Sequence, residues 1–559
     1  MKKNLVLRIF AIGFVLAFVV YGCKPKAVST EVSSVSGLIR LNQLGYFPNG
    51  VKTFVLADSA ATKFSVVAAD GKHVFEGSFT DRGVYELSGE KVLMGDFSAL
   101  KDTGVFTVFV ENLGVSYPFA IRPNLYKAAA DASVKSFYFQ RASMALEPQF
   151  AGKFARAAGH KDDSCWFHPS SGYSKGLASM PGGWYDAGDF NKYTVNAAAA
   201  LGYMLSSYEL QPGAFPDGSL NIPESGNGVS DLLDEMRYEL NWLEKMQDVD
   251  GGCFFKVTEK KFGGFVMPAD DKSQRWIVGK STAASLDFAA VGAMVARCYA
   301  ATDSVLAKKW LAAAERAWAW AKKNPSKFFQ NPEDISTGGY PDTILTEEFF
   351  WAAAELYTAT GKPAYLAEIE PLLGGIKFRL AENWRNYVDN IGYYSLLGSS
   401  SKLTAPQKDL VKAGLVALAD SLAGVVDKSA YRIPISQFEW GSNSDVLDMA
   451  IVFQQAFLAT QDAKYLNLAA ETTDYIFGKN AVNYSFVSGF GTRAVTNLHH
   501  RTQAADGIAE AIPGFISGGP NAFMQDKGNL ESGSDTTYTN THPAKAFLDV
   551  TGSYASNEL

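Results

Sequence analysis

The 559-residue sequence has few cysteines, few histidines and no cluster of basic residues. It contains four cysteines and six histidines, and 19% of its residues are charged. No two cysteines form a CxxC pair, which excludes a disulfide framework of the small secreted kind. The net charge of −7, without clustered Lys and Arg, argues against a nucleic-acid partner. A polysaccharide lyase acting on acidic uronates is disfavoured for the same reason, whereas a neutral polymer fits.

One segment combines a cysteine with two histidines. Cys165 lies three residues before His168, and His160 is nearby. A structural zinc site normally uses four nitrogen or sulfur ligands. Only three candidates stand in this segment, so the residues alone give weak support to zinc.

Long apolar runs are also scarce, and the one at the N-terminus is short. Basic residues precede the apolar residues 9–21, a run too short to span a bilayer comfortably and typical of a signal peptide. Residues 1–22 end before Cys23 in a pattern that resembles a bacterial lipobox, which predicts acylation of Cys23. The alternative is ordinary signal cleavage without lipid. We expect an exported lipoprotein anchored at the cell envelope or surface, or otherwise a secreted protein, with residues 23–36 as a tether.

Residues 37–122 have the pattern of a small β-domain. Runs of β-branched and aromatic residues occur at 53–56, 64–67 and 105–110, separated by Asn-Gly, Asp-Gly and similar turn signals. Several short strands within so few residues predict a β-sandwich of the immunoglobulin-like kind.

Residues 123–559 have the pattern of a helical domain. Apolar residues recur at helical spacing, mostly in Ala-rich segments. The predicted helices cover 126–142, 229–246, 285–302, 307–322, 347–360 and 407–422. Long polar loops, such as 213–227 and 478–497, separate them. This arrangement predicts a mainly α fold, a helical barrel with a cleft built from loops. Most of the aromatic residues, 13% of the chain, are expected in its core.

The most informative segment is 181–193, which holds Asp186 and Asp189 among glycines and aromatic residues. By itself the segment fits a loop that caps the next helix, or a calcium loop that lacks EF-hand spacing. It also fits one half of a glycosidase site, because hydrolysis of a glycosidic bond needs one carboxylate to activate water and one carboxylic acid to protonate the leaving oxygen.

Several motifs, in order along the chain, resemble glycoside hydrolase family 9, the large cellulase family, with an N-terminal immunoglobulin-like domain. They are Ile39-Arg40-Leu41-Asn42-Gln43-Leu44-Gly45-Tyr46, Gly183-Trp184-Tyr185-Asp186-Ala187-Gly188-Asp189, Trp440-Gly441-Ser442-Asn443-Ser444, Phe486 to Gly491 with Leu498-His499-His500-Arg501, Gly518-Gly519-Pro520-Asn521, and Phe547-x-Asp549-x4-Tyr554-x3-Glu558. The resemblance implies an (α/α)6-barrel catalytic domain over 123–559. It also implies a monomer that hydrolyses the β-1,4 bonds of cellulose or a related β-glucan and requires no cofactor.

The same resemblance implies roles for particular residues. Asp189 would be the general base, Asp186 would help to hold the attacking water, and Glu558 would be the general acid. A base that acts through water implies inversion at the anomeric carbon. The residues expected to bind substrate are His499, Arg501 and Tyr554, with Tyr185 and Trp440 as candidate sugar-stacking rings. Endo cleavage is the leading expectation. The alternatives are an exo-acting cellobiohydrolase or β-glucosidase, and a non-catalytic glucan-binding lipoprotein.

Two departures from the family pattern bear on metals and on the end of the chain. Ala142 stands where relatives carry a zinc-binding cysteine, and Cys165 has no adjacent histidine, which argues against zinc. Calcium occurs in several relatives, but the sequence assigns no ligand set. Relatives continue past the catalytic acid, so we expect that the native chain extends beyond Leu559. A carboxyl group in the penultimate position would also be prone to fraying.

Overall fold

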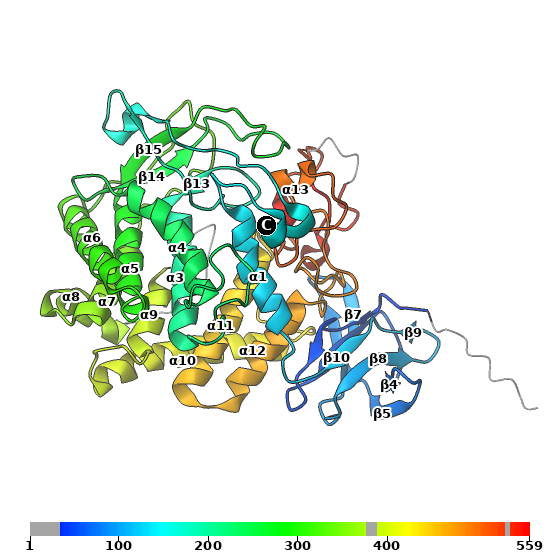
Figure 1. Cartoon of the computed structure of the whole chain (residues 1–559). Helices are drawn as coiled ribbons and strands as arrows, with labels where there is room; N and C mark the ends of the chain where they lie inside the picture. Colours follow the sequence, from blue (N-terminus) through cyan, green and yellow to red (C-terminus); the bar gives the residue numbers. More distant parts are fainter. Residues whose placement is uncertain (1–33, 376–387, 532–536) are drawn as a thin grey trace, which may run out of the picture.

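A computed structural model describes residues 34–375, 388–531 and 537–559 (Figure 1). The predicted signal peptide, Cys23 and all of the tether except residues 34–36 lie outside these described residues. Within the described ranges, no helix is long and apolar enough to cross a membrane.

The N-terminal part is the predicted β-sandwich, formed by two sheets. One sheet has the order β1-β3-β7-β6, and the other has the order β2-β10-β8-β4-β5, with β9 paired to β8. The strands are β1 (Ile39–Arg40), β2 (Gly45–Tyr46), β3 (Thr53–Ala57), β4 (Lys63–Ala68), β5 (His73–Ser78), β6 (Thr80–Tyr85), β7 (Glu90–Asp96), β8 (Gly104–Val110), β9 (Gly114–Val115) and β10 (Phe119–Ile121). Alternate residues of β8 (Phe106, Val108 and Val110) are buried, as expected for a strand with one face in the core. The three strands expected from the sequence are thereby confirmed.

The rest of the chain is a helical domain, and it is the (α/α)6 barrel that the sequence predicted. Its helices are α1 (Lys127–Gln140), α2 (Pro148–Ala151), α3 (Thr194–Leu210), α4 (Asp231–Leu243), α5 (Thr282–Cys298), α6 (Ser304–Lys323), α7 (Thr346–Thr360), α8 (Pro363–Ile369), α9 (Asp389–Leu397), α10 (Ala405–Lys428), α11 (Ser442–Thr460), α12 (Ala463–Ile476), α13 (Arg501–Ala505) and α14 (Tyr554–Asn557). Small residues let the central helices pack closely. A Cβ atom at Gly292 of α5 would lie 2.9 Å from the Cβ of Ala314 on α6.

A five-stranded sheet in the helical domain was not predicted from the sequence. Its strands are β11 (Cys165–Phe167), β12 (Leu177–Ala178), β13 (Lys192–Tyr193), β14 (Cys253–Thr258) and β15 (Trp276–Ser281), in the order β12-β11-β15-β14-β13. Strand β13 begins three residues after Asp189, and it pairs with β14 through Lys192 and Val257. The sheet therefore fixes the chain on the C-terminal side of the two aspartates.

The two domains share buried polar contacts. Arg40 of β1 forms an ion pair with Glu90 at 2.7 Å, and both side chains are less than 8% exposed. Arg40 also donates to the Tyr431 hydroxyl, and Lys545 reaches Glu90 at 2.7 Å from the helical domain. Although burial raises the pKa of Glu90, the two cations outweigh this effect and lower the pKa to about 2. The β-sandwich is thus joined to the barrel by charges that are fully paired only when both domains are present.

Candidate active site

The segment that carries the two aspartates is anchored by buried acidic residues of α4. Gly182 and Gly183 have φ angles of 86° and 81°, a conformation that favours glycine. The backbone N–H of Trp184 donates to Glu239, and its indole N–H donates to Glu235 at 2.9 Å. Arg141 pairs with the same Glu235 at 2.9 Å, so the carboxylate is compensated. The turn before Asp186 is therefore rigid.

Asp186 and Asp189 have different hydrogen-bond partners in one cavity. Asp186 accepts bonds from Asn196 at 2.8 Å and from the Tyr340 hydroxyl at 2.7 Å. Asp189 accepts bonds from the Asn191 amide and, at 3.4 Å, from the Tyr193 hydroxyl. Burial, and then the charge of Asp189, raise the pKa of Asp186 to about 7. At neutral pH the pair can therefore retain a proton.

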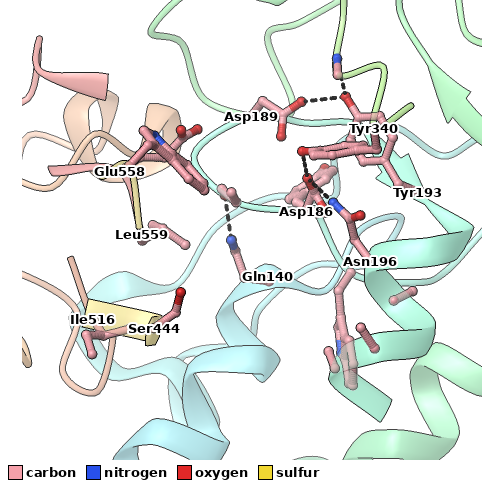
Figure 2. Close-up of a pocket in the computed structure, with 18 of the residues that line it drawn as sticks. Gln140, Asp186, Asp189, Tyr193, Asn196, Tyr340, Ser444, Ile516, Glu558 and Leu559 are labelled. Atoms are coloured by element: carbon pink, nitrogen blue, oxygen red, sulfur yellow. Dashed lines mark hydrogen bonds between the residues drawn. The ribbon is translucent and has the colours of Figure 1, made fainter. Parts of the chain in front are cut away.

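Glu558 lies across the cavity from these aspartates (Figure 2). Helix α14 ends at Asn557, and Glu558 has an extended conformation, so it does not share a helical face with Tyr554. Its segment is held by backbone hydrogen bonds on both sides. The His499 N–H donates to the Asn557 carbonyl at 2.9 Å, and the Gly518 N–H donates to the Glu558 carbonyl at 2.6 Å. Burial, and then the charge of Asp189, raise the pKa of Glu558 to about 8.

A close backbone contact holds the two sides of the cavity together. The Arg501 N–H donates to the Gly188 carbonyl at 3.0 Å. A Cβ atom at position 188 would lie 2.1 Å from the His499 carbonyl oxygen, so only glycine fits. Because His499 also pairs with the chain at Glu558, this contact sets the spacing between the base side and the acid side.

His499 and Arg501 project into the cavity and meet a third group, Glu531. The His499 Nδ1–H donates to the Thr551 carbonyl at 2.7 Å, which directs Nε2 toward Glu531 at 3.6 Å. The Arg501 guanidinium also lies 3.6 Å from Glu531. Burial lowers the pKa of His499, which favours the neutral ring at neutral pH. These groups offer donors and acceptors suited to sugar hydroxyls.

The three predicted aromatic residues lie in different environments. Trp440 and Tyr554 are partly exposed in the cavity, and the Trp440 indole N–H donates to the Tyr554 carbonyl at 3.1 Å. Tyr185 is only 2% exposed, and its hydroxyl bonds to His160 at 2.8 Å. Its ring packs against Phe190. Tyr185 borders the cavity, but its burial leaves little free ring face, so its sugar-stacking role stays a prediction.

The cavity has a volume of about 1510 Å³ and is lined by both apolar and polar side chains. The sequence missed several polar groups of the site: Asn196, Tyr340 and Glu531, which line the cavity, and the buried Asn191, which donates to Asp189. Asn191 stands inside the informative motif and could have been selected as a hydrogen-bonding neighbour. Tyr340 and Glu531 lie in loops far along the chain, where neither spacing nor composition indicates a site.

The residues considered for zinc do not form one site. The Cys165 thiol donates to the Asp162 carbonyl at 3.6 Å, while His168 pairs with Asp334 at 3.1 Å. His160 turns its Nδ1 to Tyr185 instead. The three cysteines within the described ranges are free and buried.

An acidic group next to the cavity has the composition of a calcium site. Carboxylate oxygens of Asp342, Glu347 and Glu348 lie within 4.8 Å of one another. Burial, followed by the charges of neighbouring carboxylates, raises the pKa of Glu348 well above its usual range. Oxygen-only ligands of this kind suit a hard cation such as Ca²⁺. The group therefore fits calcium.

A helical barrel with aspartates and a glutamate across a long cleft defines a glycoside hydrolase of the helical-barrel class. The chain belongs to glycosyl hydrolase family 9, whose model matches residues 126–559, and the model of the cellulase N-terminal ig-like domain matches residues 35–115. A xyloglucan-specific endo-beta-1,4-glucanase of Bacteroides ovatus is 37% identical over 99% of this chain and 96% of its own length. Endoglucanase D of Acetivibrio thermocellus is 31% identical over 93% of this chain and 81% of its own length. A solved structure of a Bacteroides ovatus family 9 protein has a TM-score of 0.86 and 36% identity, covering 93% of this chain and 96% of that one.

The contact at Gly188 generates a prediction about substitution. Gly188→Ala should reduce kcat by roughly 100-fold, because the new methyl group pushes the 499 segment, and with it Glu558, away from Asp189. The measurement is steady-state hydrolysis of a soluble β-glucan. Gly213→Ala is the matched control, since nothing lies within 4 Å of a Cβ at that position. Equal activity of the two variants would show that the contact does not set the geometry.

Proposed function

We propose that the chain is an endo-acting, inverting β-1,4-glucanase. Glu558 donates its proton to the glycosidic oxygen as the bond to the anomeric carbon breaks. On the opposite face of the sugar, Asp189 accepts a proton from the water that attacks that carbon. The observation that carries this proposal is the position of Glu558 across the cavity from Asp189, with a pKa raised to about 8 by burial and by that charge.

Asp186 helps to hold the attacking water and lets Asp189 act as the base. Both oxygens of Asp186 are occupied by the Asn196 amide, and one also accepts from Tyr340. The hydrogen bonds to Asp189 from described residues reach Oδ2, which leaves Oδ1 to accept from water. Burial and the charge of Asp189 raise the pKa of Asp186 to about 7, so Asp186 can hold a proton near neutral pH.

The substrate is a β-1,4-glucan backbone, with cellulose-type and xyloglucan chains as the two leading candidates. A cavity of about 1510 Å³ exceeds the size typical of small-molecule sites and suits several sugar units of a polymer. A relative with 37% identity over nearly the whole chain acts on xyloglucan. Exo action is the second candidate, because a cellulose 1,4-beta-cellobiosidase at 30% identity and a cellodextrinase at 31% identity also match. A non-catalytic binding protein is disfavoured, since it would gain nothing from the three carboxyl groups.

Activity is tested by following viscosity and reducing ends together on carboxymethylcellulose and on xyloglucan. The parent should lower viscosity well before reducing ends accumulate, and proton NMR should show the α-anomer first. Asp189→Ala and Glu558→Gln should each lower kcat by about 10²- to 10⁴-fold, the usual contribution of general acid–base groups.

Glu510→Gln serves as the control for these variants, because Glu510 is exposed and lies outside the cavity lining. Asp189→Ala that retained most of the activity would overturn the base assignment. Reducing ends that rise without an early loss of viscosity would favour the exo alternative.

The raised pKa of Glu558 predicts the alkaline side of the pH profile. The general acid must carry its proton, so kcat/KM should fall about tenfold per pH unit above the pKa of about 8. The measurement is kcat/KM from pH 5 to 10 (roughly the range in which side chains of this kind titrate), with circular dichroism recorded alongside to show that the fold persists. A fall in kcat/KM that began near the unperturbed pKa of glutamate would contradict the role of Glu558.

We also propose that the protein is an exported lipoprotein attached to a membrane through Cys23. The basic start, the apolar residues 9–21 and the position of Cys23 support this proposal. Cells that express the full chain should incorporate labelled palmitate into it, and Cys23→Ser should abolish the label and release the protein from the membrane fraction. Equal labelling of both forms would exclude a lipid on Cys23.

A further inference from the structure

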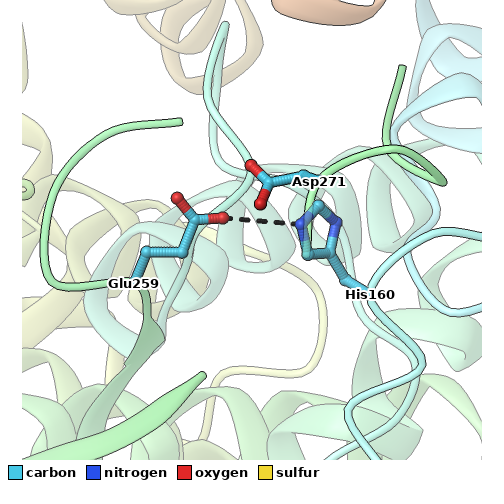
Figure 3. Close-up of side chains that lie close together, drawn as sticks. All are labelled: His160, Glu259 and Asp271. Carbon is cyan, nitrogen blue, oxygen red and sulfur yellow. Dashed lines mark ion pairs between the residues drawn. The ribbon is translucent and has the colours of Figure 1, made fainter. Parts of the chain in front are cut away.

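A second group of ligating side chains lies beside the loop of residues 259–275, which joins β14 to β15. It consists of His160, Glu259 and Asp271, whose ligand atoms all lie within 4.8 Å of one another (Figure 3). The side chains of His160 and Glu259 are each only 2% exposed. The three residues are not used by the proposed hydrolysis.

The ligand atoms of His160 and Glu259 are buried without ordinary hydrogen bonds, whereas Asp271 is half-buried and its Oδ1 accepts from the Ser273 N–H at 2.8 Å. Neither His160 Nε2 nor either carboxylate oxygen of Glu259 has a hydrogen-bond partner among the described residues. The His160 Nε2 to Glu259 Oε1 distance is 3.4 Å. Around a tetrahedral ion with bonds of about 2.1 Å, neighbouring ligand atoms lie about 3.4 Å apart. The spacing is thus that of two ligands of one ion.

The orientation of the His160 imidazole is fixed by a hydrogen bond on its other ring nitrogen. His160 Nδ1 bonds to the Tyr185 hydroxyl at 2.8 Å, which leaves Nε2 directed at Glu259. Ligating histidines in metal sites are normally held by such a bond on their other ring nitrogen. The same bond gives the buried Tyr185 hydroxyl a partner.

The carboxylates in and beside the cluster outnumber the cationic side chains that face them. Arg275 lies 3.6 Å from Glu259 but is bonded to Asp162 at 3.1 Å, and Lys192 is paired with the same Asp162 at 2.7 Å. Three carboxylates, counting Asp162, Glu259 and Asp271, therefore face two cationic side chains. An uncompensated buried carboxylate is costly, and a metal ion is one means of compensation.

We propose that His160, Glu259 and Asp271 bind one divalent ion of the zinc class, with water as a fourth ligand. One imidazole and two carboxylates form a mixed nitrogen and oxygen set, which such ions accept and which calcium does not prefer. The site shares His160 with the cysteine-containing arrangement that the sequence argued against, but it replaces the cysteine with two carboxylates, and it is separate from the all-oxygen group at Asp342.

The ion would fix the loop that touches the sugar-binding pair. The carbonyl of Gly263 accepts a bond from the Arg501 Nε–H at 2.7 Å, and the Phe265 ring lies edge-on to His499 at 5.4 Å. Glu259 and Asp271 stand near the two ends of this loop, and the ion would tie both to His160. Any effect of the ion on KM for the glucan rests on the proposed function, whereas binding of the ion itself does not.

The test uses the full protein without a histidine tag, freed of metal by a chelator and then saturated with Ca²⁺. Titration with ZnCl₂ in a calorimeter should show one tight equivalent for the parent. Co²⁺ should give the visible absorption of a four-coordinate ion, which zinc should displace. Asp271→Asn should weaken zinc binding by at least about tenfold. Asp270→Asn, at an exposed neighbouring position, should match the parent.

Thermal unfolding with and without zinc separates a metal site from an ion-pair network. In chelator, Asp271→Asn should be at least as stable as the parent, because it removes a carboxylate that faces Glu259. Zinc should raise the Tm of the parent but not of this variant. A parent that binds no zinc, or a variant that binds it equally well, would overturn the proposal. The proposal would also be overturned if Asp271→Asn were less stable than the parent in chelator and zinc changed the Tm of neither protein.

Discussion

The active site depends on one backbone junction, at which residues 188, 499 and 557 meet. Gly188 lies against the His499 carbonyl, and the His499 N–H donates to Asn557. Residue 188 is more than 300 positions from residue 499, which is 58 positions from residue 557, yet each is joined to the next by main-chain atoms. Main-chain contacts leave little freedom, so the separation between Asp189 and Glu558 is a property of the fold rather than of flexible side chains.

Burial of like charges then determines how the carboxyl groups differ. Desolvation and the negative charge of Asp189 raise the pKa values of both Asp186 and Glu558. One charged carboxylate is thereby surrounded by groups that hold protons more tightly than in water. The donors that hold the two aspartates come from helix α3, strand β13 and loops: Asn196, Tyr193, Asn191 and Tyr340. Opposite roles for chemically similar side chains follow from position alone.

Much of the fold and the chemical centre of the site could be predicted from the sequence. Asp186 and Asp189 were recognisable because turn glycines and aromatic neighbours surround them, and the long helices were recognisable from their period. The sheet of β11 to β15 was not, since β12 and β13 have only two residues each and carry no alternating pattern. The burial of Tyr185 could not be predicted, because sequence proximity to Asp186 does not fix on which side of the loop a ring lies. Glu531 joins His499 only through tertiary folding, which no local signal indicates.

The ion pair between Arg40 and Glu90 has a consequence for how such proteins can be recombined. Arg40 relies on Tyr431 of the barrel, and Glu90 relies on Lys545, so each domain completes the other's charge compensation. A chimera that joined this β-sandwich to an unrelated barrel would bury a guanidinium and a carboxylate with half of their partners missing. Shuffling the N-terminal domain as an interchangeable module would therefore require the partner positions, Tyr431 and Lys545, to travel with it.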